Sequence, residues 1–259
     1  EALLEHDAVR LFVDRAQAAQ RDFRLDDTNA PALADICAQL DGIPLALELA
    51  AARVRALSVE AIAARIGDRF RLLKTSDQTV LPRQRTLRAL IDWSHDLLSE
   101  AERTLFARLS VFAGGWTLEA AEAVAPGGDG DLIDRDDVLD LLASLVEKSL
   151  VAMDADGSRY RYLDTVRAYA AERLGEPGGV SGSRAVRDRH LGHFLRFAES
   201  PAARAGGQQA IQWRRRVDAE RENVLSAWFW AIDHADDPQW SMRLAYALGA
   251  YWTDRGMVG

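Results

Sequence analysis

The residues of this 259-residue chain that could carry catalytic or metal chemistry are few and poorly arranged for it. His190 and His193 stand one helical turn apart, but no cysteine or third histidine lies nearby to complete a metal site. Ser94, His95 and Asp96 have the residue types of a hydrolase triad, yet neighbouring helical residues point about 100° apart and cannot align as one. We therefore predict no catalytic residues and no metal site.

Glycine-rich stretches at 126–130 and 178–184 raise the question of a phosphate-binding loop. A Walker-type loop needs Gly-Lys followed by Ser or Thr, with a second glycine five residues before that Gly-Lys pair. The two lysines of the chain, Lys74 and Lys148, have no glycine before them. The chain is therefore predicted to be no enzyme and to hydrolyse no nucleotide by itself.

Gly42 and Pro44 interrupt two helical patterns in the stretch LDGIPLALELAAARV, residues 40–54. A glycine just past a helix adopts the left-handed backbone that ends it, and a proline in the first turn of the next helix loses no hydrogen bond. The bare pattern thus predicts a helix-to-helix elbow, and the surrounding sequence must decide whether the elbow also binds a ligand.

The composition describes a globular chain long enough for two or three domains, with 48% hydrophobic residues and a net charge of −8. The longest apolar run, 43–52, is broken by Glu48 and is much shorter than the roughly 20 residues of a membrane span. A single cysteine, Cys37, fits a reducing cytoplasm. Because the chain begins at Glu1 and stops at Gly259 within a helical pattern, we expect a piece of a longer protein.

Residues 1–79 are predicted to form a small helical bundle. Apolar residues recur at helical spacing over 6–19 and 30–40, Pro44 begins a third helix, and Ser58 can cap a fourth over 59–73. The next segment, 74–85, loses this periodicity and contains Pro82, which predicts a domain boundary.

Residues 80–176 are predicted to form a winged helix-turn-helix domain. Thr117 and the Ser99/Glu102 capping box begin two of its helices, and an Asp-Gly turn at Gly157 indicates a short β-hairpin. The expected order is helices, hairpin and final helix, with helices over 87–98, 100–112, 118–124, 136–149 and 164–174.

Residues 183–259 are predicted to be helical repeats, with helices over 185–200, 208–234 and 238–255. Antiparallel helices rich in tryptophan suggest the first, truncated TPR-like units of an α-solenoid. Leu244, Leu248 and Trp252 form an apolar stripe on the last helix. We expect this helix to have an open face and to self-associate through the region from Trp240 to Trp252. The predicted fold is therefore mainly α: helical bundle, winged helix-turn-helix with one small β-hairpin, and the start of a solenoid.

The charge of the predicted winged helix opposes direct DNA binding. Residues 86–174 contain nine basic and 17 acidic side chains, and phosphate affinity requires the opposite balance. The helix that would enter the major groove, DDVLDLLASLVEKSL, presents Asp136, Asp137, Asp140 and Glu147 against Lys148.

The elbow, the run PRQRTLRALIDWSHDLLSEAERTLFARLSVFAGGWTLEAAEAV and the stretches LASLVEKSLV and YRYLDTVRAYAAERL resemble the STAND class of nucleotide-switch ATPases. The similarity covers almost the whole chain and is to bacterial regulators of LuxR and AfsR type. It implies a helical domain, a winged helix and a repeat sensor that follow a nucleotide-binding domain, which this piece lacks.

The resemblance also implies binding residues. In the family, the Gly-x-Pro elbow, here Gly42, Ile43 and Pro44, leans against the base and sugar of ADP or ATP. A family Met-His-Asp that reaches the phosphate corresponds to Tyr162, Leu163 and Asp164, and only Asp164 carries over because leucine cannot donate a hydrogen bond. ATP or ADP is therefore expected in the intact parent only, with no cofactor in this piece.

The implied function is a cytoplasmic regulatory relay that couples nucleotide state to a sensor. The expected partners are the parent's own nucleotide-binding domain and an unknown protein or small-molecule signal at the repeats, with no membrane. Two alternatives stay open: a transcription factor that binds DNA through the winged helix, and a solenoid scaffold for protein interactions.

Overall fold

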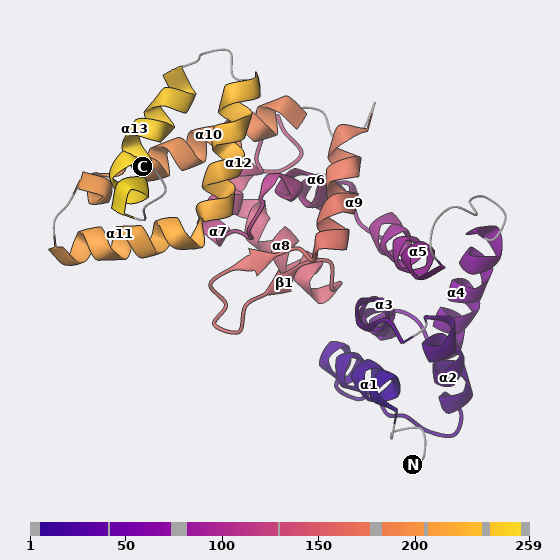
Figure 1. Cartoon of the computed structure of the whole chain (residues 1–259). Coiled ribbons are helices and arrows are strands. Elements are labelled where there is room, and N and C mark those ends of the chain that lie inside the picture. The colour runs from indigo at the N-terminus through magenta and orange to yellow at the C-terminus, as the bar shows by residue number, and fades with distance from the viewer. Residues whose placement is uncertain are drawn as a thin grey trace. The chain divides into compact units, whose positions relative to one another are not determined.

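The structure, a computed structural model, describes residues 6–40, 42–73, 82–128, 130–176, 183–204, 207–234 and 239–254 (Figure 1). It is mainly helical, with one two-stranded antiparallel sheet among the described residues. The chain divides into two compact units, Glu1–Glu100 with Ala143–Val151, and Ala101–Leu142 with Ala152–Gly259. No helix among the described residues is both long enough and apolar enough to cross a membrane.

The first unit is a bundle of helices. Helix α1 packs on α3, α2 packs on α4, and both α3 and α4 contact α5. The Oγ atom of Ser58 accepts a hydrogen bond from the Ala61 amide at 3.3 Å, which confirms the predicted cap. The elements are α1 (Asp7–Ala19), α2 (Ala30–Gln39), α3 (Pro44–Ala51), the 3-10 helix η2 (Ala52–Arg55), α4 (Val59–Leu73) and α5 (Pro82–Asp96).

The elbow between α2 and α3 has the predicted backbone. Gly42 has φ of +63°, and its amide donates to the Cys37 carbonyl at 3.2 Å, so it ends α2 in the left-handed region. Pro44 lies in the first turn of α3. Farther along that helix, Glu48 forms an ion pair with Arg15 of α1 at 3.2 Å, which fixes the alanine-rich helix against its neighbour.

The second unit begins with the predicted order of helices, hairpin and helix. Thr117 caps α7 by accepting a hydrogen bond from the Ala120 amide at 3.2 Å, as predicted. The helix expected over 136–149 is a 3-10 turn followed by α8, and the second half of α8 clusters with the first unit. The elements are α6 (Glu100–Arg108), η3 (Leu109–Val111), α7 (Leu118–Val124), η4 (Arg135–Asp137), α8 (Val138–Glu147), β1 (Ala152–Met153), β2 (Tyr160–Arg161) and α9 (Asp164–Gly175).

The β-hairpin is confirmed, with strands of two residues each. Ala152 pairs with Arg161 and Met153 with Tyr160, in antiparallel register. Trp116 adds a third, isolated bridge, since its amide and carbonyl each form a 2.8 Å hydrogen bond with Tyr160. The hairpin is therefore anchored to the segment just before α7.

Four further helices complete the second unit. The single helix predicted over 208–234 is wrong, because the chain breaks at Glu220 into two helices. The break allows the side chains of Glu220 and Asn223 to contact the winged helix, as described below. The elements are α10 (Ser183–Ala198), the 3-10 helix η5 (Pro201–Arg204), α11 (Gly207–Ala219), α12 (Arg221–His234) and α13 (Gln239–Asp254).

The apolar stripe predicted to be open on α13 is instead covered. Leu244 and Leu248 are fully buried, and the Trp252 ring packs on Trp228 of α12 with centroids 5.1 Å apart. The stripe itself is therefore not open, because α10 and α12 cover it. Met242 and Tyr246, elsewhere on α13, are exposed, and self-association through residues 240–252 stays a prediction.

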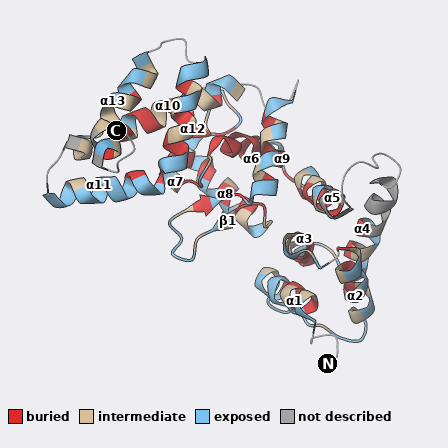
Figure 2. Cartoon of the chain, viewed as in Figure 1, coloured by how far each residue is buried: buried red, intermediate tan, exposed pale blue. Residues whose placement is uncertain are grey.

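An aromatic core joins the winged helix to α10. The Phe112 ring stacks on Trp116 and meets the Phe194 ring of α10 edge to face, at centroid distances of 5.5 and 6.4 Å. The Tyr162 hydroxyl donates to the Phe106 carbonyl at 2.8 Å, and burial raises the pKa of this phenol well above its ordinary value. Figure 2 shows the buried residues of α6 and its neighbours as a continuous red region.

Candidate functional site

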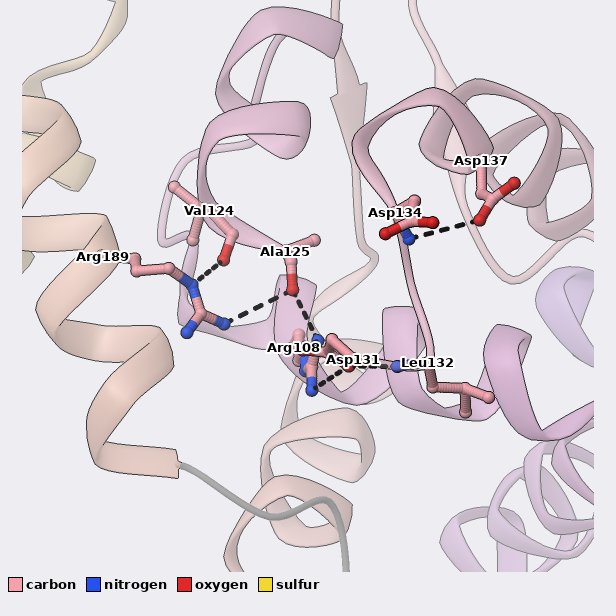
Figure 3. Close-up of polar contacts among 8 residues, drawn as sticks. All are labelled: Arg108, Val124, Ala125, Asp131, Leu132, Asp134, Asp137 and Arg189. Carbon is pink, nitrogen blue, oxygen red and sulfur yellow. Dashed lines mark hydrogen bonds and ion pairs between the residues drawn. The ribbon is translucent and has the colours of Figure 1, made fainter. Parts of the chain in front are cut away.

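The segment before α8 is fixed by a buried arginine of α6. The Arg108 guanidinium donates to both carboxylate oxygens of Asp131, at 2.7 and 3.0 Å, and to the Ala125 carbonyl at 2.8 Å (Figure 3). Burial acts to raise the pKa of Asp131, but the hydrogen bonds and charge of Arg108 outweigh it, so this pKa lies below its ordinary value. The segment that leads into α8 is therefore anchored by a charged pair.

A second arginine, from α10, holds the end of α7. The Nε of Arg189 donates to the Val124 carbonyl at 2.8 Å, beside the carbonyl that Arg108 contacts (Figure 3). We call α8 the recognition helix, because it is the helix that enters the major groove in winged helices that read DNA. Asp134 and Asp137 form a reciprocal capping box at η4, which leads into this helix. The segment that leads from α7 into α8 is thus held by Arg108 at Asp131 and by the capping box, while Arg189 holds the end of α7.

The exposed face of α8 is acidic and apolar. Leu139, Asp140 and Glu147 are exposed and follow helical spacing along α8, and Asp136 is exposed in the 3-10 helix η4 just before it. Glu147 forms an ion pair with Arg55 within the first unit. In a winged helix that reads DNA, this helix enters the major groove, where carboxylates are repelled by phosphates.

The hairpin offers little free positive charge. Arg161 lies 3.7 Å from the carboxylate of Asp154, and Arg159 forms a hydrogen-bonded ion pair with Glu220. In the hairpin loop, the Asp156 carboxylate accepts hydrogen bonds from the Ser158 amide and hydroxyl. Both arginines of the second strand region are therefore neutralised by nearby carboxylates.

A buried asparagine ties the winged helix to α12. Asn223 is fully buried, accepts a hydrogen bond from the Ala113 amide at 2.8 Å and donates to the Gly115 carbonyl and the Glu220 carboxylate, both at 2.7 Å. Glu220 in turn holds Arg159 of the hairpin. We call these five residues the Asn223 joint. No sequence pattern indicates it, because its partners lie about a hundred residues apart.

The two histidines of α10 are part of the packing. His190 is 3% exposed and lies between the rings of Phe112 and Phe194, with centroids 5.2 and 4.8 Å away. Burial lowers its pKa to about 3, so the ring is neutral at pH 7. His193 is half-buried, and burial lowers its pKa as well. Among the described residues, no three His, Cys, Asp or Glu side chains gather as a metal site would require.

The residues that the resemblance assigns to nucleotide lie in both units. Gly42 and Pro44 are exposed at the elbow of the first unit, with Ile43 half-buried between them. Asp164 is exposed at the start of α9 in the second unit, and Leu163 before it is 39% exposed. The serine of the Ser94, His95, Asp96 run is buried on α5.

Residues 98–175 match the family model described as a winged helix-turn-helix domain, which covers α6 to α9. The chain is 43% identical over 251 residues to "Putative HTH-type transcriptional regulator Mb0914c" of Mycobacterium bovis and to "Putative HTH-type transcriptional regulator Rv0890c" of Mycobacterium tuberculosis. Each alignment covers 96% of this chain and 27% of the relative.

A further relative, "Uncharacterized protein Rv0894" of Mycobacterium tuberculosis, is 42% identical over 190 residues, which is 73% of this chain and 48% of that protein. The chain thus spans about a quarter of the length of the first relatives and about half of this one. It contains a winged helix-turn-helix domain, within a sequence that is similar over nearly all its length to proteins named as HTH-type transcriptional regulators.

Proposed function

We propose that the chain is a regulatory segment of an HTH-type transcriptional regulator, in which the winged helix relays a signal through protein contacts. The observation that carries this proposal is the acidic, exposed surface of η4 and α8, with Asp136 of η4 and Asp140 of α8 where a DNA reader would need basic side chains. The chain spans about a quarter of its first relatives, and we propose that DNA contact does not lie in this segment.

The second unit supports a relay because its parts are joined by specific polar contacts. The Asn223 joint connects α12 to the start of α7 and to the hairpin, and Arg189 connects α10 to the end of α7. Buried polar contacts of this kind specify one arrangement of the parts. A signal that breaks them would release a distinct second arrangement, as a two-state switch requires.

Direct DNA binding by the winged helix is the second candidate function. It is favoured by the match of residues 98–175 to a winged helix-turn-helix domain and by the printed names of the relatives. The fold alone does not decide between the relay and direct DNA binding, because function depends on the surface that the fold presents.

Binding to duplex DNA tests the two candidates. We expect no change in fluorescence anisotropy of a labelled random duplex with the 259-residue chain at about 50 mM salt, where phosphate contacts are strongest. The double variant Asp136→Lys/Asp140→Lys should gain salt-sensitive binding. If the unchanged chain binds and Arg161→Gln weakens that binding, the winged helix is a DNA reader and our proposal is wrong.

We also propose that nucleotide controls the relay in the full-length parent, through Gly42, Pro44 and Asp164. This proposal rests on the resemblance to STAND regulators and is supported by the exposure of the elbow. In the full-length protein, Pro44→Ala should weaken ADP binding in calorimetry, because the fixed ring contact is lost. Pro31→Ala is the matched control, since Pro31 is also exposed in the first turn of a helix. Unchanged ADP affinity in Pro44→Ala would refute the proposal.

A further inference from the structure

A cavity of about 530 Å³ lies in the second unit, where the winged helix meets α10 and α11. Its walls are the start of α7, the hairpin loop, one face of α10 and the last turn of α11. A volume of this size falls within the range of about 300–1,000 Å³ that small-molecule sites have in proteins. The cavity is therefore large enough for a small metabolite.

Two arginines in the cavity wall have no carboxylate partner among the residues that the structure describes. Within the described part of the chain, Arg196 of α10 and Arg216 of α11 form no ion pair, and the Arg216 guanidinium lies 5.4 Å from the Phe197 ring. The third arginine of the wall, Arg159, is paired with Glu220. Glu119 is the other carboxylate of the wall, so the unpaired guanidinium groups outnumber it.

The rest of the cavity combines aromatic and hydrogen-bonding groups. Phe194 and Phe197 of α10 present rings, and Ser200 lies near them in the same wall. The half-buried imidazole of His193 also lines the cavity and can donate or accept a hydrogen bond in its neutral form. Guanidinium groups beside aromatic rings suit a ligand that has an anionic group and a flat apolar body.

We propose that this cavity binds a small organic anion, with its carboxylate or phosphate oxygens on Arg196 and Arg216 and its body against Phe197. The site adds a ligand to the molecule and does not depend on the proposed relay function. An anionic group in the cavity also competes with Glu220 for Arg159, and Glu220 belongs to the Asn223 joint. Ligand occupancy therefore acts on the contact between the winged helix and α12.

Titration of the 259-residue chain with the fluorescent dye anilinonaphthalene sulfonate tests this site, because the dye has both an aromatic body and an anionic group. Arg216→Gln and Arg196→Gln should each weaken dye binding about tenfold, the loss expected for a charge-assisted hydrogen bond. Arg215→Gln is the matched control, since Arg215 is an exposed neighbour on the same helix that does not line the cavity. Equal dye affinity in all three variants would overturn the proposal.

Glu220→Gln is expected to raise dye affinity, whereas the two arginine variants lower it. This change keeps an oxygen that can accept from Asn223 but removes the carboxylate that competes for Arg159, so dye affinity should rise severalfold. Competition then identifies the anionic group: displacement of the dye by benzoate supports a carboxylate ligand, and displacement by inorganic phosphate supports a phosphate ligand. If neither anion displaces the dye, or if neutral benzyl alcohol displaces it equally well, the anion site is refuted.

Discussion

At the scale of single residues, Asn223 does more than fill space in the second unit. Its amide group satisfies one backbone N–H and one backbone C=O of the segment before α7, at 2.8 and 2.7 Å. The bond to the Gly115 carbonyl is buried, and the bond to the Ala113 amide is part-buried. The cost of losing this side chain therefore includes the desolvation of two partners.

Asn223→Ala is expected to lower the free energy of unfolding by about 2–4 kcal/mol, because the Ala113 amide and the Gly115 carbonyl lose their partner. Urea denaturation followed by circular dichroism measures this difference. Arg221→Ala, at an exposed position on the same helix, is the control and should change the value by no more than about 0.5 kcal/mol. A loss of the same small size in Asn223→Ala would show that the joint contributes little stability.

His190 makes stability depend on pH. Its pKa is about 3 in the folded chain, against the ordinary value of 6.5. Above about pH 6.5 the ring is neutral in both states, and below it the unfolded chain binds a proton that the folded chain does not. Stability is therefore expected to fall as pH decreases from about 6.5 toward 3, by at most about 1.4 kcal/mol per pH unit.

His190→Phe should remove most of this dependence, because phenylalanine fits between Phe112 and Phe194 and carries no titrating group. The measurement is the difference in urea midpoint between about pH 7 and pH 5. His193 leaves a residual dependence of the same sign, since burial lowers its pKa too. His6→Phe, at an exposed position, is the control. If the difference in urea midpoint between the two pH values is unchanged in His190→Phe, His190 is not the source of the pH dependence.

At the scale of elements, two glycines with positive φ differ in their surroundings. Comparing alanine variants at the two positions distinguishes the cost of backbone strain from the cost of a steric clash. Gly115 has φ of +84°, and a Cβ atom there would lie 2.7 Å from the Tyr160 carbonyl oxygen. Gly157, in the hairpin loop, has φ of +73° and open space around it. Of these two positions, Gly115 requires glycine both for its positive φ and for its close contact with Tyr160, whereas Gly157 requires it for its positive φ alone.

Gly157→Ala is expected to cost about 1–2 kcal/mol, the usual penalty for a left-handed residue with a Cβ atom. Gly115→Ala should cost at least about 2 kcal/mol more, because the new methyl group displaces β2 from Trp116. Thermal unfolding of the two variants gives the comparison. Equal losses would show that the segment before α7 moves freely away from the hairpin.

The helices and the hairpin are the part of the structure that the sequence predicts well. Helical periodicity, the Thr117 cap and the Asp-Gly turn at Gly157 are local signals, and each marks an element within a few residues of its observed position. The break at Glu220 was missed because its cause is not local. At this break, the side chains of Glu220 and Asn223 contact the distant Arg159 and Gly115.

The charge of the candidate site is predictable from the sequence, but the contacts that hold the site in place are not. The acidic face of α8 follows directly from the residue types at helical spacing. The Arg108 pair with Asp131, the Asn223 joint and the cavity between the hairpin and α10 all depend on tertiary packing. The covered stripe on α13 shows the same limit, since periodicity identifies an apolar face but not what covers it.

At the scale of the whole molecule, the two compact units do not follow each other along the chain. Residues 143–151 cluster with residues 1–100, although the segments on both sides of them belong to the second unit. This segment includes Leu145, Leu150 and Val151, which are at most 2% exposed, and the Glu147 partner of Arg55. The domain boundary that we proposed near residue 79 therefore separates residues that share one unit.

A fragment that begins at Pro82 tests this boundary. It keeps residues 98–175, the whole winged helix-turn-helix match, but lacks most of the unit to which 143–151 belongs. We expect it to be less stable than the full chain by about 2–5 kcal/mol in urea denaturation, because Leu145, Leu150 and Val151 lose part of their apolar cover.

Glu147→Gln in the full chain is the control for that fragment, since it removes only the exposed ion pair with Arg55 and should cost no more than about 1 kcal/mol. A fragment as stable as the full chain would establish that the boundary near residue 79 separates independent folding units. A fragment destabilised well beyond the control would instead show that the second half of α8 needs the first bundle. A change in that bundle would then reach α8 through residues 143–151.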